Sequence, residues 1–373
     1  MVCIQDNIVV RDWGNDAMKT NWQDEMTPKE RLTAFAAGKP IDRIPCMPLV
    51  TDHAYGLAGG PMSQYYHSAT LMAQAQIHAF ETYETDSVGS GPGLFGLAEA
   101  IGTKLTFPDD GIPFVCSPAI SSYQDLAKLE LIDPCRSGRL PLILEALKLV
   151  QDAVQERAAV GCSLGGPITT AAAVRGTDNF LRDMYRNPDM VHRLLQYVTD
   201  NALLFIDVLC AMGIKPSIAE PTASGTLISN KHFREFAKPY LKQYSDRISQ
   251  RCGSGPFVHI CGDTMSILDD MVDAGATVLS LDNQIDLAEA KAKVGHRACL
   301  AGNVKPFTLW RGSPQEVAAE VKECLRKAGD SPKKFILSSG CGLPVGTPAT
   351  NVLAMMDAAR HYGKWPINPD NLA

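Results

Sequence analysis

The chain of 373 residues is 45% hydrophobic and 20% charged, and its formal net charge is −6. These values are typical of a folded globular protein, and the length is enough for one large barrel or two ordinary domains. The net negative charge argues against nucleic acid as a partner, because a phosphate-binding face needs an excess of Lys and Arg. The sequence has no apolar run of about 18 residues and no secretory signal pattern, so we expect no membrane segment.

The 11 cysteines are odd in number and scattered along the chain. Such a set is not typical of a disulfide framework, and it indicates a protein of the reducing cytoplasm. Most of these side chains are expected to be small buried apolar groups. A cysteine with another role must therefore be identified by its position relative to the strands.

Short apolar runs bounded by Gly, Pro or Asp alternate with amphipathic helical patterns along the chain. We predict strands at residues 44–50, 86–90, 159–163, 216–220, 257–261, 277–282, 298–303 and 335–340. Helix starts are marked by a capping residue and a following Pro at Thr27-Pro28, Asn187-Pro188 and Ser313-Pro314. Eight strands alternating with helices predict an α/β fold of the (β/α)8 TIM-barrel type. The alternative is an open doubly wound sheet, but the chain has no GxGxxG or P-loop sequence to support a nucleotide site.

The predicted organisation is a single domain with two additions. Residues 1–26 precede the first capping box and are interpreted as an N-terminal extension, with the barrel spanning residues 27–373. Residues 103–120 are interpreted as a β-hairpin inserted between the second and third strands. We find neither a low-complexity segment nor an interdomain linker.

His259 and Cys261 lie two residues apart in the predicted strand 257–261, which Gly262 follows. Side chains two apart on a strand point to the same face, and the carboxyl ends of barrel strands form the active-site face. An imidazole and a thiolate are good ligands for zinc. By itself, this His-x-Cys pair could also be a buried structural pair.

A third candidate ligand, Cys341, stands between Gly340 and Gly342 just after the predicted strand 335–340. Glycines let the backbone turn and expose the side chain between them. The separation from Cys261 is far too long for a zinc finger, but it fits two barrel strands that converge on one mouth. Three protein ligands leave one tetrahedral position open, which is typical of a catalytic zinc.

Motifs outside this cluster resemble the uroporphyrinogen decarboxylase superfamily. They include Asp42-Arg43-Ile44-Pro45, Ala301-Gly302-Asn303 and the run Gly342-Leu343-Pro344-Val345-Gly346-Thr347-Pro348. The resemblance covers nearly the whole barrel, and it implies a (β/α)8 fold.

The decarboxylases themselves match poorly at the site. The stretch after the first strand, Pro48 to His53, lacks their substrate-gripping arginines. Their aspartate falls at Gly93, their tyrosine near Ala173 and their histidine at Cys341. A tetrapyrrole with eight carboxylates needs cationic clamps, and these are missing.

The same departures resemble another branch of the superfamily, the zinc- and corrinoid-dependent methyltransferases. That branch carries a His-x-Cys…Cys zinc motif, which here is His259, Cys261 and Cys341. The run from Ala219 to Ser229 also resembles the methylcobalamin:coenzyme M methyltransferases. The resemblance implies Zn²⁺ as cofactor and methylcobalamin, held by a corrinoid protein, as co-substrate. Two anionic cysteines would balance the charge of the metal and keep a bound substrate sulfur electron-rich.

Six further residues are weaker candidates. Glu220 and Asp282 each end a strand and could be a further ligand or hydrogen-bond His259, or they could cap a helix instead. Asn303 could contact substrate or cofactor or hold a loop. Asp52 and His53 could bind substrate, cofactor or metal, or they could form a solvated loop pair. Arg175 could meet an anionic substrate tail or form a surface ion pair.

We therefore predict a zinc-dependent methyltransferase that moves a methyl group between methylcobalamin and a small substrate. The expected substrate is a thiol such as coenzyme M, or otherwise a methoxy or methylamine compound. The alternatives are a uroporphyrinogen decarboxylase-type lyase and a non-catalytic metal-binding barrel. The expected partners are the corrinoid protein and the small molecule, and a homodimer is one arrangement that the sequence leaves open.

Overall fold

A computed structural model describes residues 24–367 and residue 372. Most of the predicted N-terminal extension, residues 1–26, lies outside the described residues.

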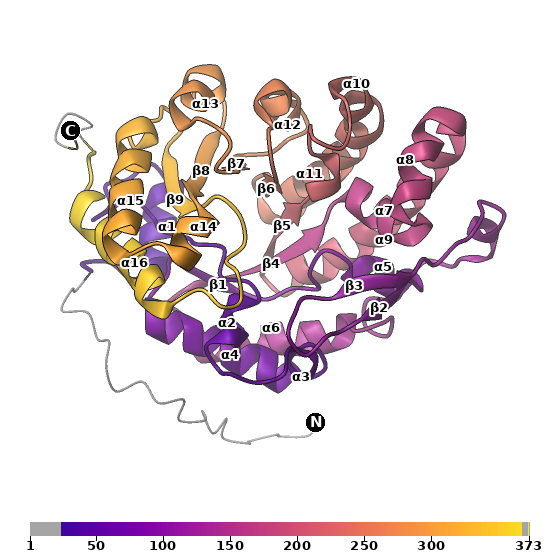
Figure 1. The fold of residues 1–373 in the computed structure, drawn as a ribbon, viewed down its shortest axis with the longest axis horizontal. Helices are drawn as coiled ribbons and strands as arrows, with labels where there is room; N and C mark the ends of the chain where they lie inside the picture. Colours follow the sequence, from indigo (N-terminus) through magenta and orange to yellow (C-terminus); the bar gives the residue numbers. More distant parts are fainter. Residues whose placement is uncertain (1–23, 368–371, 373) are drawn as a thin grey trace.

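Seven parallel strands form one curved sheet in which the strand order follows the chain, as expected for a barrel (Figure 1). Most of the predicted strands are confirmed to within two residues at either end, because short buried apolar runs favour parallel strands. The bounds are β1 Ser87–Gly89, β4 Ala159–Gly165, β5 Lys215–Ala219, β6 Phe257–Ile260, β7 Val278–Leu281, β8 Cys299–Val304 and β9 Phe335–Ser339.

Helices cover the outside of the curved sheet (Figure 1). The two predicted capping boxes are present, with Thr27 capping α1 and Ser313 capping α15. The helices are α1 Pro28–Ala36, α2 His53–Gly56, α3 Met62–Tyr66, α4 Ala69–Tyr83, α5 Gly96–Ile101, α6 Leu140–Val154, α7 Pro167–Arg175, α8 Thr177–Arg186, α9 Pro188–Ala211, α10 Asn230–His232, α11 Lys238–Cys252, α12 Leu268–Asp273, α13 Leu287–Val294, α14 Pro306–Arg311, α15 Pro314–Ala328 and α16 Ala349–Tyr362.

The prediction of a regular first strand at residues 44–50 is wrong. Only Cys46 forms a bridge, in parallel with Leu337 of β9, although the Cys46 carbonyl also accepts from the Asp86 amide (3.1 Å). Pro45 and Pro48 have no N–H to donate, so a continuous ladder cannot form. The segment still lies between β9 and β1, at the position that the first strand of the barrel would occupy.

The predicted hairpin insertion is confirmed. β2 (Lys104–Thr106) and β3 (Phe114–Ser117) pair antiparallel in a separate two-stranded sheet. Ile112 and Phe114 at its far end are about half exposed. Ile112 also lines the cavity described below, so the insertion contributes to the wall of the site.

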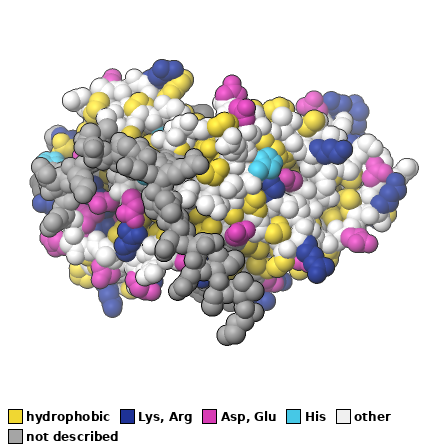
Figure 2. Space-filling model, turned by 90° about the horizontal axis from the view of Figure 1, so that it is seen from below, with side chains coloured by type: hydrophobic (Ala, Val, Ile, Leu, Met, Phe, Trp, Pro, Cys, Tyr) yellow, Lys and Arg dark blue, Asp and Glu magenta, His cyan; other side chains and the backbone are white. Residues whose placement is uncertain are grey.

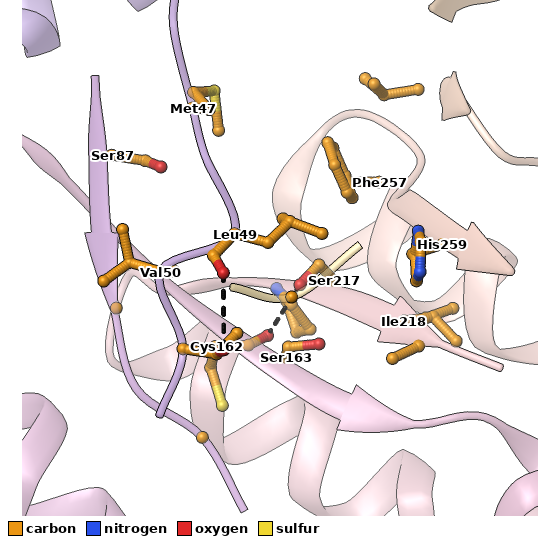
Figure 3. Close-up of a pocket in the computed structure, with 18 of the residues that line it drawn as sticks. Met47, Leu49, Val50, Ser87, Cys162, Ser163, Ser217, Ile218, Phe257 and His259 are labelled. Atoms are coloured by element: carbon orange, nitrogen blue, oxygen red, sulfur yellow. Dashed lines mark hydrogen bonds between the residues drawn. The ribbon is translucent and has the colours of Figure 1, made fainter. Parts of the chain in front are cut away.

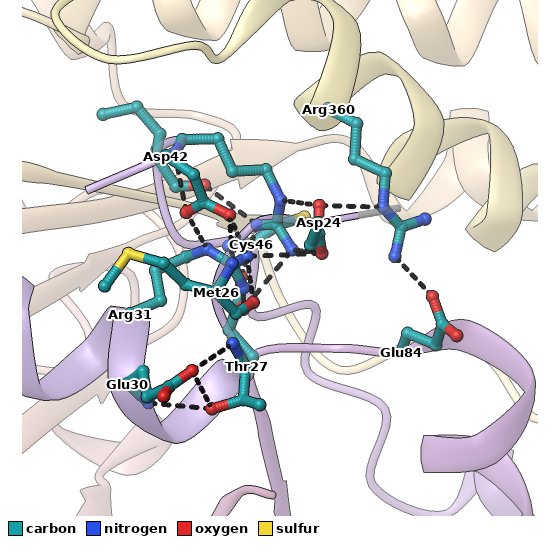
Figure 4. A network of polar contacts seen from close by, with 12 residues as sticks. Asp24, Met26, Thr27, Glu30, Arg31, Asp42, Cys46, Glu84 and Arg360 are labelled. Carbon is teal, nitrogen blue, oxygen red and sulfur yellow. Dashed lines mark hydrogen bonds and ion pairs between the residues drawn. The ribbon is translucent and has the colours of Figure 1, made fainter. Parts of the chain in front are cut away.

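A buried network of ion pairs fixes the start of the barrel near the predicted first strand (Figure 4). Asp86, just before β1, is fully buried and pairs with both Arg31 and Arg43. It also accepts a hydrogen bond from the Cys46 amide at 2.6 Å. Asp42 pairs with Arg31, while Asp24 pairs with Arg31, Arg43 and Arg360. The network therefore joins α1, α16 and the irregular first segment to β1.

One helix, α9, is long and apolar enough to cross a membrane by length and composition, contrary to the expectation from the sequence. Half of its most apolar window is buried inside the fold. Its buried stripe, which includes Leu194, Leu195 and Phe205, is part of the main hydrophobic core. A core helix of a globular protein has the same properties.

On the face shown in Figure 2, acidic and basic side chains are interspersed.

Candidate metal centre

β6 carries His259 at its carboxyl end, and Cys261 follows directly after the strand. Gly262 then turns the chain with a φ of +76°, a conformation that favours glycine. A Cβ at Gly262 would lie only 2.8 Å from the Ser224 Oγ atom, so the position also has little room for a side chain. This turn holds the two predicted ligands toward the same space.

The structure brings the three predicted ligands together. The His259 Nε2 atom lies 3.2 Å from Cys261 Sγ, and Cys261 Sγ lies 3.6 Å from Cys341 Sγ. One ligand atom from each residue falls within 4.8 Å of the others. Cys341 follows β9, where Ser339 Oγ donates to the Cys341 carbonyl at 2.8 Å and fixes the turn. One imidazole and two sulfurs at this spacing match the donor set of a zinc site.

Ser280 on β7 orients the imidazole, a role that the sequence did not reveal. Its Oγ lies 3.1 Å from His259 Nδ1, and the β6–β7 register places the two residues opposite each other. With Nδ1 occupied, Nε2 is left facing the cysteines. Glu220 and Asp282 are the candidate partners of His259 that the sequence offers, but both carboxylates have other partners.

The two cysteine sulfurs are in hydrogen-bonding contact, and this contact shifts their pKa values in opposite directions. The contact with Cys261 lowers the pKa of Cys341. His259 lowers it further. The same contact, followed by burial, raises the pKa of Cys261. The lowered pKa of Cys341 favours its thiolate form, which is the form that binds metal.

Glu220 lies next to β6, where its amide donates to the His259 carbonyl at 2.8 Å, but its carboxylate caps α7. Its carboxylate accepts hydrogen bonds from the amides of Ile168 and Thr169 and from the Thr169 hydroxyl (2.7–3.1 Å). The side chain is fully buried, and burial raises its pKa to about 7 although these bonds oppose the rise. Of the roles that the sequence leaves open for Glu220, the structure therefore shows helix capping, and the helix it caps is α7.

Asp282 and Asn303 form the support beneath the Cys261 turn. Asp282 Oδ2 accepts from the Gly262 amide at 2.9 Å, and Oδ1 accepts from the Gln284 amide. Asn303 donates to the carbonyls of Asp282 and Ile285 at 2.9 and 2.7 Å. Both residues therefore hold loops in place: Asp282 fixes the turn after Cys261, and Asn303 fixes the loop that carries Asp282.

Asp52 and His53 are adjacent in the chain but face different surroundings. Asp52 lines the central cavity, and burial raises its pKa. His53 is buried, with Nδ1 against the Val345 carbonyl (3.1 Å) and Nε2 against the Tyr83 hydroxyl (2.8 Å), which gives it a structural position. Arg175 pairs with Asp183 at 3.0 Å and is not among the residues that line the cavity.

A cavity of about 1520 Å³ runs through the barrel and reaches the cluster at the carboxyl ends of the strands. Small inward-facing residues, including Gly161, Ser163 and Ser217, leave this space open where larger side chains fill most barrels. Figure 3 shows part of the wall, with Ser163, Ser217 and His259 coming from the successive strands β4, β5 and β6. His259, Cys261 and Cys341 all line the cavity, so a small molecule can reach the metal-binding atoms.

The chain belongs to the uroporphyrinogen decarboxylase family. The model for "Uroporphyrinogen decarboxylase (URO-D)" matches residues 27–362. This family membership and the fold agree with the resemblance seen in the sequence.

Similar proteins include both methyltransferases and decarboxylases. The methylcobamide:CoM methyltransferase MtaA of Methanosarcina barkeri is 30% identical, over 91% of this chain and 99% of its own length. The solved structure of a methyltransferase from Methanosarcina mazei has a TM-score of 0.81 and 28% identity, covering 91% of this chain and 99% of that one. Uroporphyrinogen decarboxylase 2 of Arabidopsis thaliana is 29% identical, over 90% of this chain and 86% of its own length.

Overall identity therefore does not choose between a methyltransferase and a decarboxylase, since the two values differ by a single per cent. The side chains at the mouth of the barrel are more informative. They combine two sulfurs and an imidazole at metal-binding spacing. They do not supply the several free cations that a substrate with eight carboxylates requires.

Proposed function

We propose that the protein is a zinc-dependent methyltransferase that moves a methyl group between a corrinoid and a small substrate. The cluster of His259, Cys261 and Cys341 at an open cavity is the observation that carries this proposal. The similarity to methylcobamide:CoM methyltransferases over nearly the whole chain supports it. The substrate is a small thiol, for which coenzyme M is the example among the relatives, or otherwise a methoxy or methylamine compound.

The three side chains would hold Zn²⁺ through His259 Nε2 and the two sulfur atoms. Zinc bound there would supply the Lewis acidity that keeps a substrate thiol deprotonated at neutral pH. The chain itself contributes orientation, because Ser280 fixes the imidazole and Asp282 and Ser339 fix the two cysteine turns. Two anionic cysteines keep the site electron-rich, which favours nucleophilic sulfur.

The cavity can enclose a small substrate within the barrel. Its wall includes the apolar residues Leu343, Pro344 and Val345, which follow Cys341 in the chain. Exclusion of water there strengthens the charge interactions of a bound thiolate. The corrinoid would approach from the open mouth, carried by a separate protein.

Methyl transfer from methylcobalamin to a thiol tests the proposal directly. The zinc-loaded protein should demethylate methylcobalamin, which a change of its visible spectrum reports, and should produce the methyl thioether. Cys341→Ala removes one ligand and should lower the rate by at least about 100-fold, more than loss of a hydrogen-bonding partner would. Cys135→Ala is the matched control, because Cys135 is an exposed free cysteine away from the cavity.

Two results would contradict the proposal. Unchanged turnover in Cys341→Ala would exclude the ligand set. Release of carbon dioxide from a porphyrinogen, without methyl transfer, would assign the decarboxylase reaction instead.

A further inference from the structure

A polar recess of the cavity lies beside the segment that carries Cys341. We define it by Asp52, Tyr66, Ser90 and Arg139, which all line the cavity and come from four different segments of the chain. The metal-binding residues line the same cavity. The recess is thus a candidate for the part of the site that holds the rest of a metal-bound substrate.

The loop that carries Asp52 packs directly on the segment that carries Cys341. The Leu343 amide donates to the Leu49 carbonyl at 2.9 Å, and the Leu49 amide donates to Ser339 Oγ at 3.0 Å. Thr51 Oγ1 lies 3.4 Å from the position that a Cβ of Gly342 would take. These contacts place the recess within the reach of a small molecule bound at the cluster.

Two hydroxyl groups of the recess are buried and form no hydrogen bond of good geometry with the described residues. They are Tyr66 Oη and Ser90 Oγ. Buried hydroxyls without a partner are rare because their desolvation is not compensated. The neighbouring Tyr65 is held by Gln76, whose amide donates to the Tyr65 hydroxyl at 3.1 Å and to the Thr51 carbonyl at 3.0 Å. The wall is therefore built in advance. The Tyr66 hydroxyl lies against the Asp52 carboxyl group and Ser90 lies against the Tyr65 hydroxyl, and both hydroxyls keep the capacity to accept a hydrogen bond from a ligand.

The charges of the recess do not favour an anion. Arg139 is neutralised by Glu99, since its Nε lies 3.0 Å from both carboxylate oxygens, and it also donates to the Tyr66 carbonyl. Asp52, by contrast, forms no ion pair within residues 24–367. Burial raises the pKa of Asp52, whereas the Tyr66 hydroxyl and the charge of Arg139 lower it and so favour the carboxylate. With Asp52 ionised, the charges of Asp52, Glu99 and Arg139 leave one negative charge in excess.

Other cations that line the cavity lie at its opposite end. Lys215 begins β5, and Lys333 and Lys334 precede β9, so they stand at the amino ends of the strands. The cluster stands at the carboxyl ends. A short anionic substrate bound at the cluster would thus meet Asp52 before it met an unpaired cation.

We propose that this recess binds the tail of the substrate and selects a positively charged, hydrogen-bond-donating tail, such as an ammonium group, over a sulfonate. Asp52 supplies the opposing charge, and the Tyr66 and Ser90 hydroxyls, which line the same cavity, accept hydrogen bonds. The inference rests on the proposed function for the position of the sulfur end. The preferred tail differs from the sulfonate of coenzyme M, the thiol for which the relatives are named. We infer this preference from the charges of this chain.

Thiols that differ only in their tails test the recess. Zinc-loaded protein would be titrated by calorimetry with 2-aminoethanethiol, 2-mercaptoethanol and 2-mercaptoethanesulfonate, and with the three-carbon homologue of each. We expect the amines to bind at least tenfold more tightly than the sulfonates of equal length, with the alcohols between them. Tighter binding of the sulfonates, or equal binding of all three tails, would overturn the proposal.

Two variants assign the selectivity to named side chains. Asp52→Asn keeps the shape of the side chain and should weaken amine binding at least tenfold while changing alcohol binding by less than threefold. Tyr66→Phe should weaken binding of the amines and the alcohols by a few fold. Asp152→Asn, which alters an exposed carboxylate on α6, should change neither. An equal loss for all three tails in Asp52→Asn would show a merely structural role and overturn the proposal.

The zinc content of the same samples separates the two levels of inference. A protein that binds zinc but not the aminoalkanethiols contradicts the recess and leaves the methyltransferase proposal standing. A protein that binds no zinc contradicts the proposed function and this inference with it.

Discussion

Two buried polar clusters lie at opposite ends of the barrel, and they differ in what completes them. The network of Asp86, Arg31 and their neighbours stands at the amino ends of the strands. It pairs three guanidinium groups with the carboxylates of Asp24, Asp42 and Asp86, and Arg360 also pairs with Glu84 and Asp357. The cluster of His259, Cys261 and Cys341 stands at the carboxyl ends. Its members contact one another, and they also line a cavity.

The difference shows in the pKa values of the acids near each cluster. Burial would raise the pKa of Asp24, but hydrogen bonds and charges from Arg43 and its neighbours hold it at about 2. Near the other cluster, Glu220 is buried with only neutral donors, and its pKa is raised to about 7. A polar cluster whose charged groups all pair with one another stabilises the fold. A cluster that lines a cavity and can bind a metal ion is suited to function.

The largest effect on stability is expected at the network. Asp86→Ala leaves Arg31 and Arg43 buried without their shared carboxylate, which should lower the free energy of unfolding by about 3–5 kcal/mol. Urea unfolding at pH 7 measures this loss. Asp152→Ala, which breaks an exposed pair with Lys148, should cost less than about 0.5 kcal/mol. A loss below about 1 kcal/mol for Asp86→Ala would show that the network does not hold the fold.

Glu220 should give the folded protein a pH dependence of the opposite sign to that of a paired acid. The folded state keeps the proton up to about pH 7, whereas the unfolded chain releases it near the ordinary value of 4.5. The protonated acid therefore favours folding at low pH, and stability falls as the pH rises between 4.5 and 7, by about 3 kcal/mol for this residue. Glu220→Gln should flatten that slope in urea unfolding measured across this range. The same slope in both proteins would contradict the assignment.

Ser280 should matter for the metal more than for the fold. Ser280→Ala removes the hydrogen bond to His259 Nδ1, and we expect zinc affinity to fall by about 10- to 100-fold. The metal-free protein should lose only about 1 kcal/mol. Ser338→Ala is the matched control, because this buried serine on β9 donates to the Met47 carbonyl instead of to a ligand. Equal zinc affinity in both variants would remove Ser280 from the site.

Most of the barrel could be predicted from the sequence because its strands are short apolar runs with clear ends. The first segment could not, since Ile44–Val50 has the composition of a strand but contains two prolines that interrupt the ladder. The Cys46 bridge and the Asp86 hydrogen bonds, which are tertiary contacts, keep it in place instead.

The site was predictable where its residues share a strand or follow one. His259 and Cys261 are two residues apart, and Cys341 follows a strand between glycines. Ser280 was missed because a serine on a strand is an ordinary residue, and only the β6–β7 register places it opposite His259. The recess was missed because its residues come from separate segments that meet only in the fold.

X-ray absorption at the zinc edge tests the central claim most directly. The account predicts one zinc per chain with one nitrogen ligand at about 2.0–2.1 Å and two sulfur ligands at about 2.3 Å. Addition of a substrate thiol should raise the sulfur count to three, and Cys341→Ala should lower it by one. Four ligands from the protein, with no change on thiol addition, would contradict a catalytic metal centre.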